Sequence, residues 1–371
     1  MLTTKSNQIR GYMMKRTKLN LPPESVVYTG DYNNDNTIIE VISYNQEKFK
    51  FDTFTDSDFE SEIMVMMDTK KTIWINIIGL NVVDTIIKIG EIFGLSPLVL
   101  EDIVHVSQRS KIEFTDNYLF SLFKMIYRAD PKDDKNSKVK GDVLHEHLSI
   151  LLLENIVITF QENEGDVFDG VRRRLKEKVG KIRTQGADYL YYVLLDALVD
   201  NQLEILASIG DEIDEHEQST AEMSKGSMDR LFKLRKQLLL IRASVIPFKD
   251  IMVELQSEKS EWISSEVKVY LSDVSDHVNH VNDLVGLYRE MVNNIYEINM
   301  LNTGNKLNHI MAVLTVFTAL FIPLNFMTGF FGMNFTHFPG MKEPNAIPVF
   351  LITSLVIVTG MTVFFKMKKW F

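Results

Sequence analysis

The arrangement of apolar and polar positions changes near residue 187 of this 371-residue chain. Before that point, short apolar runs alternate with stretches of helical spacing. The expected strands are 37–44, 72–78, 118–127, 146–153 and 155–161, and the expected helices are 82–93 and 97–105. This mixture predicts an α/β domain with long helices over residues 26–256, preceded by a flexible, polar N-terminal tail at residues 1–25.

From residue 187 onward the spacing is helical almost without interruption. It predicts helices at 187–219 and 228–256, the second with a kink at Pro247. A further helix begins near residue 260 and meets no proline until Pro323. Such length is typical of a coiled coil, a membrane span or the two in series. We therefore expect a stalk helix over residues 257–310.

Two stretches near the C-terminus are long and apolar enough to cross a bilayer. Residues 307–341 and 346–365 contain no Asp, Glu, Lys or Arg. A span needs about 20 apolar residues, and 311–331 and 347–365 meet that length. The alternative is a pair of helices buried in a soluble core, but such helices seldom lack charge over so long a stretch. We expect two transmembrane helices.

The segments that flank the spans predict their orientation. The loop at 332–346 is short, and the tail at 366–371 is basic, with Lys366, Lys368 and Lys369 beside an aromatic anchor. By the positive-inside rule this tail lies in the cytoplasm. Two spans then place the N-terminal domain there as well, so we expect a multi-pass protein of the cell membrane (inner or plasma membrane) with both termini cytoplasmic.

A polar stripe follows one side of the first span and its approach. At alternating steps of three and four residues it comprises Asn308, Met311, Thr315, Thr318, Ile322, Asn325 and Gly329. Residues at this spacing share one side of a coiled helix, and polar groups in hydrocarbon turn toward protein or water. Spacing alone leaves two interpretations open: contacts between helices, or the lining of a pore. Two spans cannot enclose a water-filled path, so a pore requires several subunits.

The stripe carries no charge, and this limits the chemistry of such a pore. A fixed carboxylate would hold a divalent ion tightly, and Mg²⁺ gives up its water reluctantly. Neutral amides and carbonyls can instead hydrogen-bond the water shell of the ion. Met311 and Ile322 would form apolar rings that close by dewetting.

Composition excludes several other classes. The net charge of −10 argues against nucleic acid as a partner, and the absence of cysteine excludes disulfides and thiolate metal sites. No glycine-rich loop with a lysine is present to hold phosphates. We therefore expect neither an enzyme nor an organic cofactor, and the acidic balance is compatible with cations as partners.

The first span is followed by Gly332, Met333 and Asn334, ahead of a short loop, a last span and a lysine-rich tail. In this position the motif resembles the signature of the CorA family of magnesium and divalent cation channels, although Phe331 stands where that family usually has tyrosine. Further segments look like family segments in the family order: residues 74–80, 94–102, 160–162, 165–168, 187–190 and 196–200.

The resemblance implies a funnel-shaped homopentamer that takes up hydrated Mg²⁺, with Co²⁺ or Ni²⁺ as candidate companions, driven by the membrane potential. The long helix would line the pore from Asn308 at its inner end, and Met311 and Leu314 would form a narrow apolar gate. A ring of Asn334 side chains in the Gly-Met-Asn motif would bind the hydrated ion at the outer mouth.

The resemblance also implies regulatory Mg²⁺ sites between subunits, at Glu101, Asp102, Asp196 and Asp273. A bridging ion would remove the repulsion between carboxylates and hold the closed state. Taken singly, each of these acids is more typical of a solvated surface charge or a helix cap.

Two other functions stay open at this point. One is zinc transport on the same fold, as in the ZntB branch, although that branch tends to vary the middle residue of the motif and Met333 favours magnesium. The other is a membrane-anchored interaction protein whose spans serve only as anchors. The polar stripe and the outer motif argue against the latter.

Overall fold

The computed structural model describes residues 22, 24–55, 59–60, 71–129, 141–218, 225–257, 261–333 and 344–368. Most of the expected tail at 1–25 therefore lies outside the described residues, as does Asn334. The chain comprises two compact units, Met1–Asn293 and Asn294–Phe371.

The first unit is built on one seven-stranded sheet with the order β2-β1-β3-β7-β6-β5-β4. Only the β3–β7 pair is parallel, and the other neighbours are antiparallel. The strands are β1 (Ile38–Tyr44), β2 (Phe49–Thr55), β3 (Thr72–Ile78), β4 (Lys111–Phe114), β5 (Leu119–Arg128), β6 (Val143–Leu152) and β7 (Ile156–Gln161). Because β3 and β7 are central and covered on both faces, they read as nearly continuous apolar runs.

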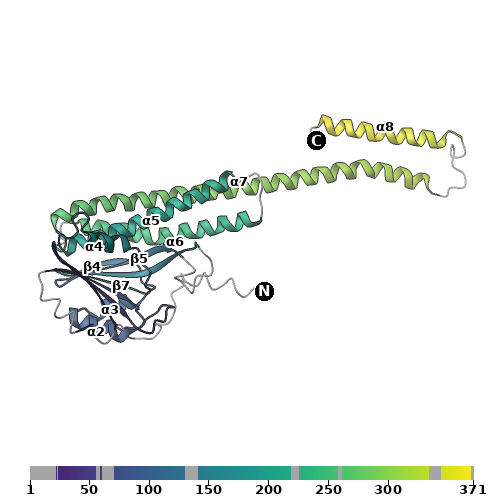
Figure 1. The fold of residues 1–371 in the computed structure, drawn as a ribbon. Helices are drawn as coiled ribbons and strands as arrows, with labels where there is room; N and C mark the ends of the chain where they lie inside the picture. Colours follow the sequence, from purple (N-terminus) through teal and green to yellow (C-terminus); the bar gives the residue numbers. More distant parts are fainter. Residues whose placement is uncertain are drawn as a thin grey trace. The chain divides into compact units, whose positions relative to one another are not determined.

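Helices cover both faces of this sheet (Figure 1). Helices α2 (Val83–Phe93) and α3 (Pro97–Val104) share one apolar core with the strands. Gly94 ends α2 with a φ of 64°, a left-handed conformation that suits glycine. Ser96 then caps α3, its hydroxyl accepting a hydrogen bond from the Val99 N–H at 3.3 Å, with Pro97 as the first helical residue.

The other face is covered by α5 (Ala187–Gln218) and α6 (Lys225–Gln256), which contact β5 and β6, while α4 (Asp169–Glu177) packs on α5. Helix α7 (Ser265–Phe331) is 67 residues long. Its first part buries an apolar row with steps of three and four residues, which is the spacing of a coiled-coil seam. That row is Val267, Leu271, Val274, Val278, Val281 and Val285.

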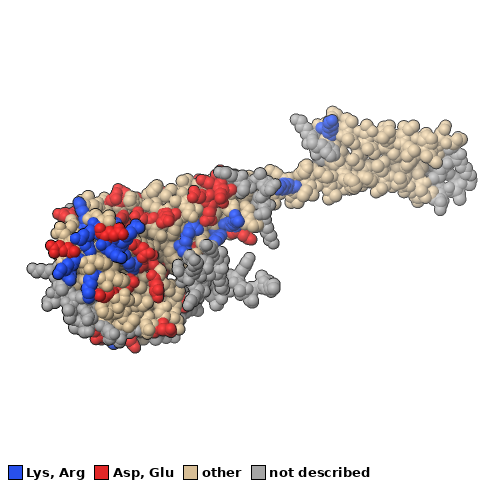
Figure 2. Space-filling view, in the orientation of Figure 1, with Lys and Arg blue, Asp and Glu red and all other residues tan. Residues whose placement is uncertain are grey.

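The second unit contains the end of α7 and the apolar helix α8 (Ala346–Met367), close to the expected bounds of 347–365. Both helices are long and apolar enough to span a membrane, and almost none of either apolar window is buried inside the protein. A core helix of a soluble protein would be mostly buried. Figure 2 shows the same contrast: Lys, Arg, Asp and Glu gather on the first unit and are nearly absent from the spans.

The mixed α/β domain, the long helix and the apolar C-terminal helix are thus confirmed. The sequence analysis placed neither β2 nor β4. It began α6 at residue 228 instead of 225 and α7 at residue 260 instead of 265. Helix α6 continues through Pro247 to Gln256.

Candidate functional site

The hydroxyl groups of the polar stripe are hydrogen-bonded within their own helix. Thr315 Oγ1 donates to the Met311 carbonyl, and Thr318 Oγ1 donates to the Leu314 carbonyl, each at 2.7 Å. This bond satisfies the only proton of the hydroxyl, which leaves its oxygen as an acceptor toward the outside of the helix. A hydrated cation presents O–H donors outward, so a surface of acceptors suits it.

The stripe lies uncovered in the single chain. All of its residues are exposed, together with Leu314, whereas Val316 of α7 and Phe365 of α8 are only 3% and 7% exposed. The exposed set is Asn308, Met311, Leu314, Thr315, Thr318, Ile322, Asn325 and Gly329. The buried part of the spans therefore excludes the stripe.

Part of the outer motif follows directly on the end of α7. The Gly332 N–H donates to the Thr328 carbonyl at 2.9 Å, and a Cβ on Gly332 would lie 2.9 Å from that same oxygen. Glycine is thus required for this close turn. Met333 follows with 53% of its surface exposed, and Asn334 is beyond the described residues.

Two of the expected carboxylates sit on α3, where they already have partners. Asp102 is 9% exposed; it pairs with Lys111 Nζ at 2.5 Å and accepts a hydrogen bond from Gln108 at 2.8 Å. Burial alone would lower the pKa of Lys111, but its hydrogen bonds to Asp102 and Glu113 raise the pKa overall. Glu101 accepts a hydrogen bond from the Glu24 N–H at 2.9 Å. A cation bound by Asp102 must therefore compete with Lys111.

The other two expected carboxylates lie in the helical layer of the first unit. Asp196 on α5 groups with Asp200 and with His277 of α7, their ligand atoms lying within 4.8 Å of one another. Burial raises the pKa of Asp196, and the nearby charge of Asp200 raises it further; Asp273 contributes in the same direction. Two carboxylates and an imidazole form a ligand set for a divalent ion.

The structure therefore separates the four expected acids into two groups. Glu101 and Asp102 belong to the layer on one face of the sheet, and Asp196 and Asp273 belong to the helices on the other (Figure 1). The sequence analysis did not place Asp200 among the candidate ligands, and it did not group His277 with Asp196. Asp200 is one helical turn from Asp196, and His277 is one turn from Asp273, so the spacing of four residues was the available signal.

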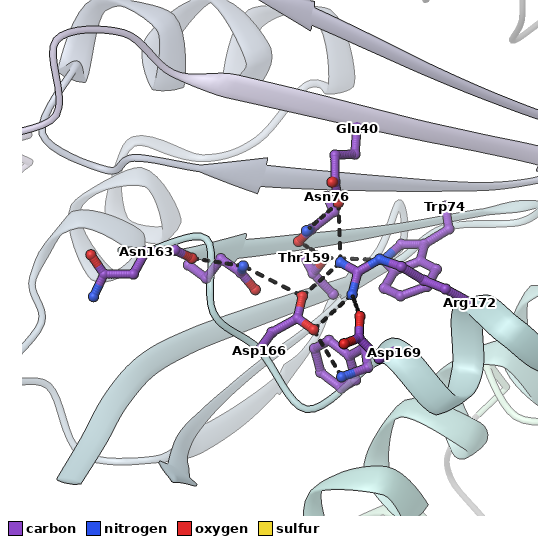
Figure 3. Close-up of polar contacts among 10 residues, drawn as sticks. Glu40, Trp74, Asn76, Thr159, Asn163, Asp166, Asp169 and Arg172 are labelled. Carbon is purple, nitrogen blue, oxygen red and sulfur yellow. Dashed lines mark hydrogen bonds and ion pairs between the residues drawn. The ribbon is translucent and has the colours of Figure 1, made fainter. Parts of the chain in front are cut away.

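A second polar cluster holds the loop between β7 and α4 against the sheet (Figure 3). Arg172 forms two bonds to Asp166, at 2.7 and 2.6 Å, and one to Glu40 at 3.0 Å. Its guanidinium lies 5.2 Å from the centre of the Trp74 ring. Because a cation of the chain already neutralises these acids, the cluster orders the loop, and a metal bound there would have to compete with Arg172.

A buried carboxylate anchors the same loop from β6. Glu146, 2% exposed, accepts hydrogen bonds from the N–H groups of Glu162 and Asn163, both at 2.7 Å. Burial raises the pKa of Glu146 to about 8, although these bonds oppose the shift.

Comparison with known proteins places these features in one family. Residues 70–369 match the model of the CorA-like Mg²⁺ transporter protein family. The chain is 39% identical, over 95% of its length and 97% of that protein, to the cobalt/magnesium transport protein CorA of Thermotoga maritima. It is 22% identical to the zinc transport protein ZntB of Yersinia pseudotuberculosis, over 74% of this chain and 81% of that one.

The fold is also that of a solved relative. The complete structure of the CorA magnesium transporter from Methanocaldococcus jannaschii superposes with a TM-score of 0.72 at 19% identity, covering 92% of this chain and all of that one. At that identity the likeness shows the fold alone. Together with the family match, it identifies the two apolar helices as transmembrane helices. The chain therefore belongs to the CorA-like Mg²⁺ transporter family, and it is a membrane transporter and not an enzyme.

Proposed function

We propose that copies of this chain form a ring, a homopentamer in the shape of a funnel, in which the stripe on α7 lines a path for hydrated Mg²⁺. The observation that carries the proposal is the uncharged, uncovered row of acceptors on the first span. We keep the domain bounds expected from the sequence, with the stalk helix itself beginning at Ser265. They are the stalk at 257–310, the spans at 311–331 and 347–365, the outer loop at 332–346 and the basic tail at 366–371. Both termini are cytoplasmic, as the lysine-rich tail indicates.

Entry needs no chemical energy. About 2.3 kcal/mol is available per charge per 100 mV, so a divalent ion gains roughly twice that on entering a negative interior. The names of the relatives support Mg²⁺ and Co²⁺ as substrates, and Ni²⁺ resembles both in charge and hydration. A path that recognises water molecules around the ion, and not the ion itself, discriminates by the size and charge of the hydrated complex.

Within the path, Asn308 marks the inner end, and Met311, Leu314 and Ile322 form the apolar constrictions. Thr315, Thr318, Asn325 and Gly329 offer acceptors or space between them. The ring of Asn334 beyond Gly332 and Met333 forms the outer binding site for the hydrated ion.

Feedback from cytoplasmic Mg²⁺ uses the carboxylates of the first unit. Within one subunit, Glu101 and Asp102 lie in a different layer from Asp196 and Asp273. An ion bound by both pairs of acids would therefore join one pair on one subunit to the other pair on its neighbour. Without the ion, the acids repel one another: burial is the main cause that raises the pKa of Asp196, and the charges of Asp200 and Asp273 raise it further within one chain. A bound ion holds the subunits in the closed arrangement, and its loss releases them.

The test is flux into liposomes that contain the purified protein. Mg²⁺ should enter, and hexaamminecobalt, a mimic of hydrated Mg²⁺, should block its entry. Asn334→Ala should abolish uptake without preventing assembly, whereas the matched loop variant Asn345→Ala should transport normally. Unchanged uptake by Asn334→Ala would refute the outer site.

Zinc transport is the second candidate, because His277 adds an imidazole to the acidic group and one relative is named for zinc. Uptake of Zn²⁺ under a proton gradient, with no uptake of Mg²⁺, would favour zinc transport over magnesium transport. The third possibility, a membrane-anchored interaction protein, is not supported, because the chain belongs to a family of transporters.

A further inference from the structure

Helix α6 carries an exposed row that combines apolar and basic side chains. Leu239, Ile246 and Val253 follow one another at seven-residue steps and are 45%, 40% and 62% exposed. A parallel line of exposed cations lies beside them at the same step, namely Arg235, Arg242 and Lys249. We call these six residues the α6 row. Seven residues are close to two helical turns, so the row runs along one side of the helix.

The α6 row cannot serve the core of its own chain. The opposite side of α6 is buried from Leu231 to Leu255, and Phe248 packs on Phe123 of β5 with ring centres 4.7 Å apart. Among the residues that the structure describes, none of the three cations of the row forms an ion pair. An exposed helix side with repeating apolar residues is typical of a docking surface.

Helix α7 carries the complementary charge at the same repeat. Asp276, Asp283 and Glu290 are exposed, follow one another at seven-residue steps and lie away from the buried valines of that helix. We call them the α7 row. Within the described ranges they too form no ion pair with a lysine or arginine of the same chain.

The two rows also match in height. Helices α6 and α7 run in opposite directions from the turn between them, where Lys268 Nζ donates to the Ser257 carbonyl at 3.2 Å (Figure 1). Lys249 lies eight residues before Ser257, and Asp276 lies eight residues after Lys268. At about 1.5 Å per residue, both lie about 12 Å from this contact. The neighbouring bond from Gln256 Nε2 to the Leu271 carbonyl, at 3.2 Å, shifts the alignment by two residues, about 3 Å, which long side chains can span. The same holds for Arg242 with Asp283 and for Arg235 with Glu290, because both rows repeat every seven residues.

We propose that the α6 row of one copy docks on the α7 row of the next copy around the ring. The inference rests on the proposed ring with α7 along its axis. Rotation about such an axis leaves heights unchanged, so each cation of α6 meets the acid of its own level on the neighbour. The contact joins two different surfaces, and a contact of that kind forms a ring when the rotation between successive copies closes, as the proposed homopentamer requires. The apolar line excludes water, and the three ion pairs fix the register.

The seam is continuous with the proposed regulatory carboxylates. Asp250 of α6 pairs with Arg109 at 3.4 Å, in the segment that follows α3 and its Asp102. On the neighbour, Asp273 lies three residues before the first member of the α7 row. Docking of the two rows therefore brings the surface around Asp102 toward Asp273 of the adjacent subunit.

Cross-linking tests the register, because the chain has no cysteine of its own. The variant with Arg242→Cys and Asp283→Cys, treated with a short bis-maleimide, should give a ladder of covalent multimers up to the complete ring. Each single variant should give none. The control pair Arg242→Cys with Val269→Cys, about 21 Å away along α7, should also give none. Monomers alone from the first pair, or an equal ladder from the control pair, would overturn the seam.

Charge reversal tests the pairing. Arg235→Glu, Arg242→Glu and Lys249→Glu together should dissociate the ring in detergent by native mass spectrometry, with an unchanged circular dichroism spectrum. Adding Asp276→Lys, Asp283→Lys and Glu290→Lys should restore it. Rings that persist through the first reversal would refute the seam.

The outcomes separate the seam from the transport proposal. If the unaltered protein forms a ring that carries Mg²⁺ but the cross-linking and charge-reversal results are not obtained, the transport proposal stands and the seam does not. If the unaltered protein forms no ring, both proposals are wrong.

Discussion

The first unit and the spans differ in how their polar side chains are paired. In the first unit, charged side chains enter the interior as pairs, as Arg172 does with Asp166 and Asp102 with Lys111. In the spans no charge is present, and threonine hydroxyls bond to their own helix. Under the proposed function the contrast separates two tasks: the unit with fixed charge would bind an ion long enough to sense it, and the unit without charge would let the ion pass.

The comparison also explains the difference in packing. The first unit buries large apolar residues around the sheet, so its stability is a property of one chain. The spans expose nearly all of their apolar surface, so in a membrane that surface is covered from outside the single chain. Substitutions in the first unit should therefore change unfolding, and substitutions in the stripe should change flux.

The largest effect is expected in the core of the first unit. Trp74 is fully buried, donates to Thr159 at 3.0 Å and contacts Phe168 edge-on. Trp74→Ala should lower the free energy of unfolding by about 3–5 kcal/mol because it leaves a large cavity. Thermal unfolding in detergent, followed by circular dichroism, measures it. Trp74→Phe, which keeps a ring, should lose less; an equal loss would contradict the cavity explanation.

A pH dependence of stability should follow from Glu146. Its pKa is raised from 4.5 to about 8 by burial, so the folded state holds a proton that the unfolded state releases. Its contribution is complete below about pH 4.5 and is lost as the pH rises to 8, with a slope of up to about 1.4 kcal/mol per pH unit. Glu146→Gln should remove that slope.

The unfolding free energy of both proteins, measured from pH 5 to 8, isolates this group. The difference between them cancels the other titrating residues, including Lys124, whose pKa burial lowers to about 8. Parallel curves for the two proteins would show that Glu146 does not titrate in this range.

A charge placed in the spans would break the contrast between the units. Thr318→Asp would set a ring of carboxylates in the path, where a charge pair is worth about 4 kcal/mol at 4 Å in a medium of intermediate dielectric. The divalent ion should then bind tightly and leave slowly, and Mg²⁺ flux should fall more than tenfold. Thr318→Ser, which keeps the hydroxyl, is the control. Faster flux in the aspartate variant would show that release does not limit the path.

The smallest effect is expected from removing charge at the proposed regulatory sites. Asp102→Ala with Asp273→Ala should shift inhibition by cytoplasmic Mg²⁺ severalfold to higher concentration, with maximal flux unchanged. Inhibition curves in liposomes at millimolar Mg²⁺ measure the shift, and Asp169→Ala, on an exposed carboxylate, is the control. An unaltered curve would remove both residues from the sensor.

Much of this architecture could be predicted from the sequence, because its signals are local. The apolar runs of β3 and β7, the cap at Ser96 and the uncharged spans each show their structure in neighbouring residues. Strand β2 is an edge strand with a mostly exposed or half-buried pattern, and β4 has four residues. Both depend on pairing with β1 and β5, which spacing does not reveal.

The residues of the candidate site also fall into those that the sequence predicts and those that only the fold brings together. The stripe could be identified because helical spacing alone brings its members together. Asp200 and His277 join Asp196 only where α5 meets α7, and the partner of Asp102 is Lys111 of another element. Contacts between elements need the fold, and contacts between copies need the assembly.

The most direct test of the central claim is chemical modification of single cysteines in a chain that has none. Thr315→Cys, Thr318→Cys, Phe317→Cys and Phe321→Cys are reconstituted separately, and Mg²⁺ flux is followed while a charged, water-soluble thiol reagent is added. The account predicts that flux stops for the two threonine positions and continues for the two phenylalanine positions. Block at the phenylalanine positions with free flux at the threonine positions would show that the ion does not pass along this face of α7.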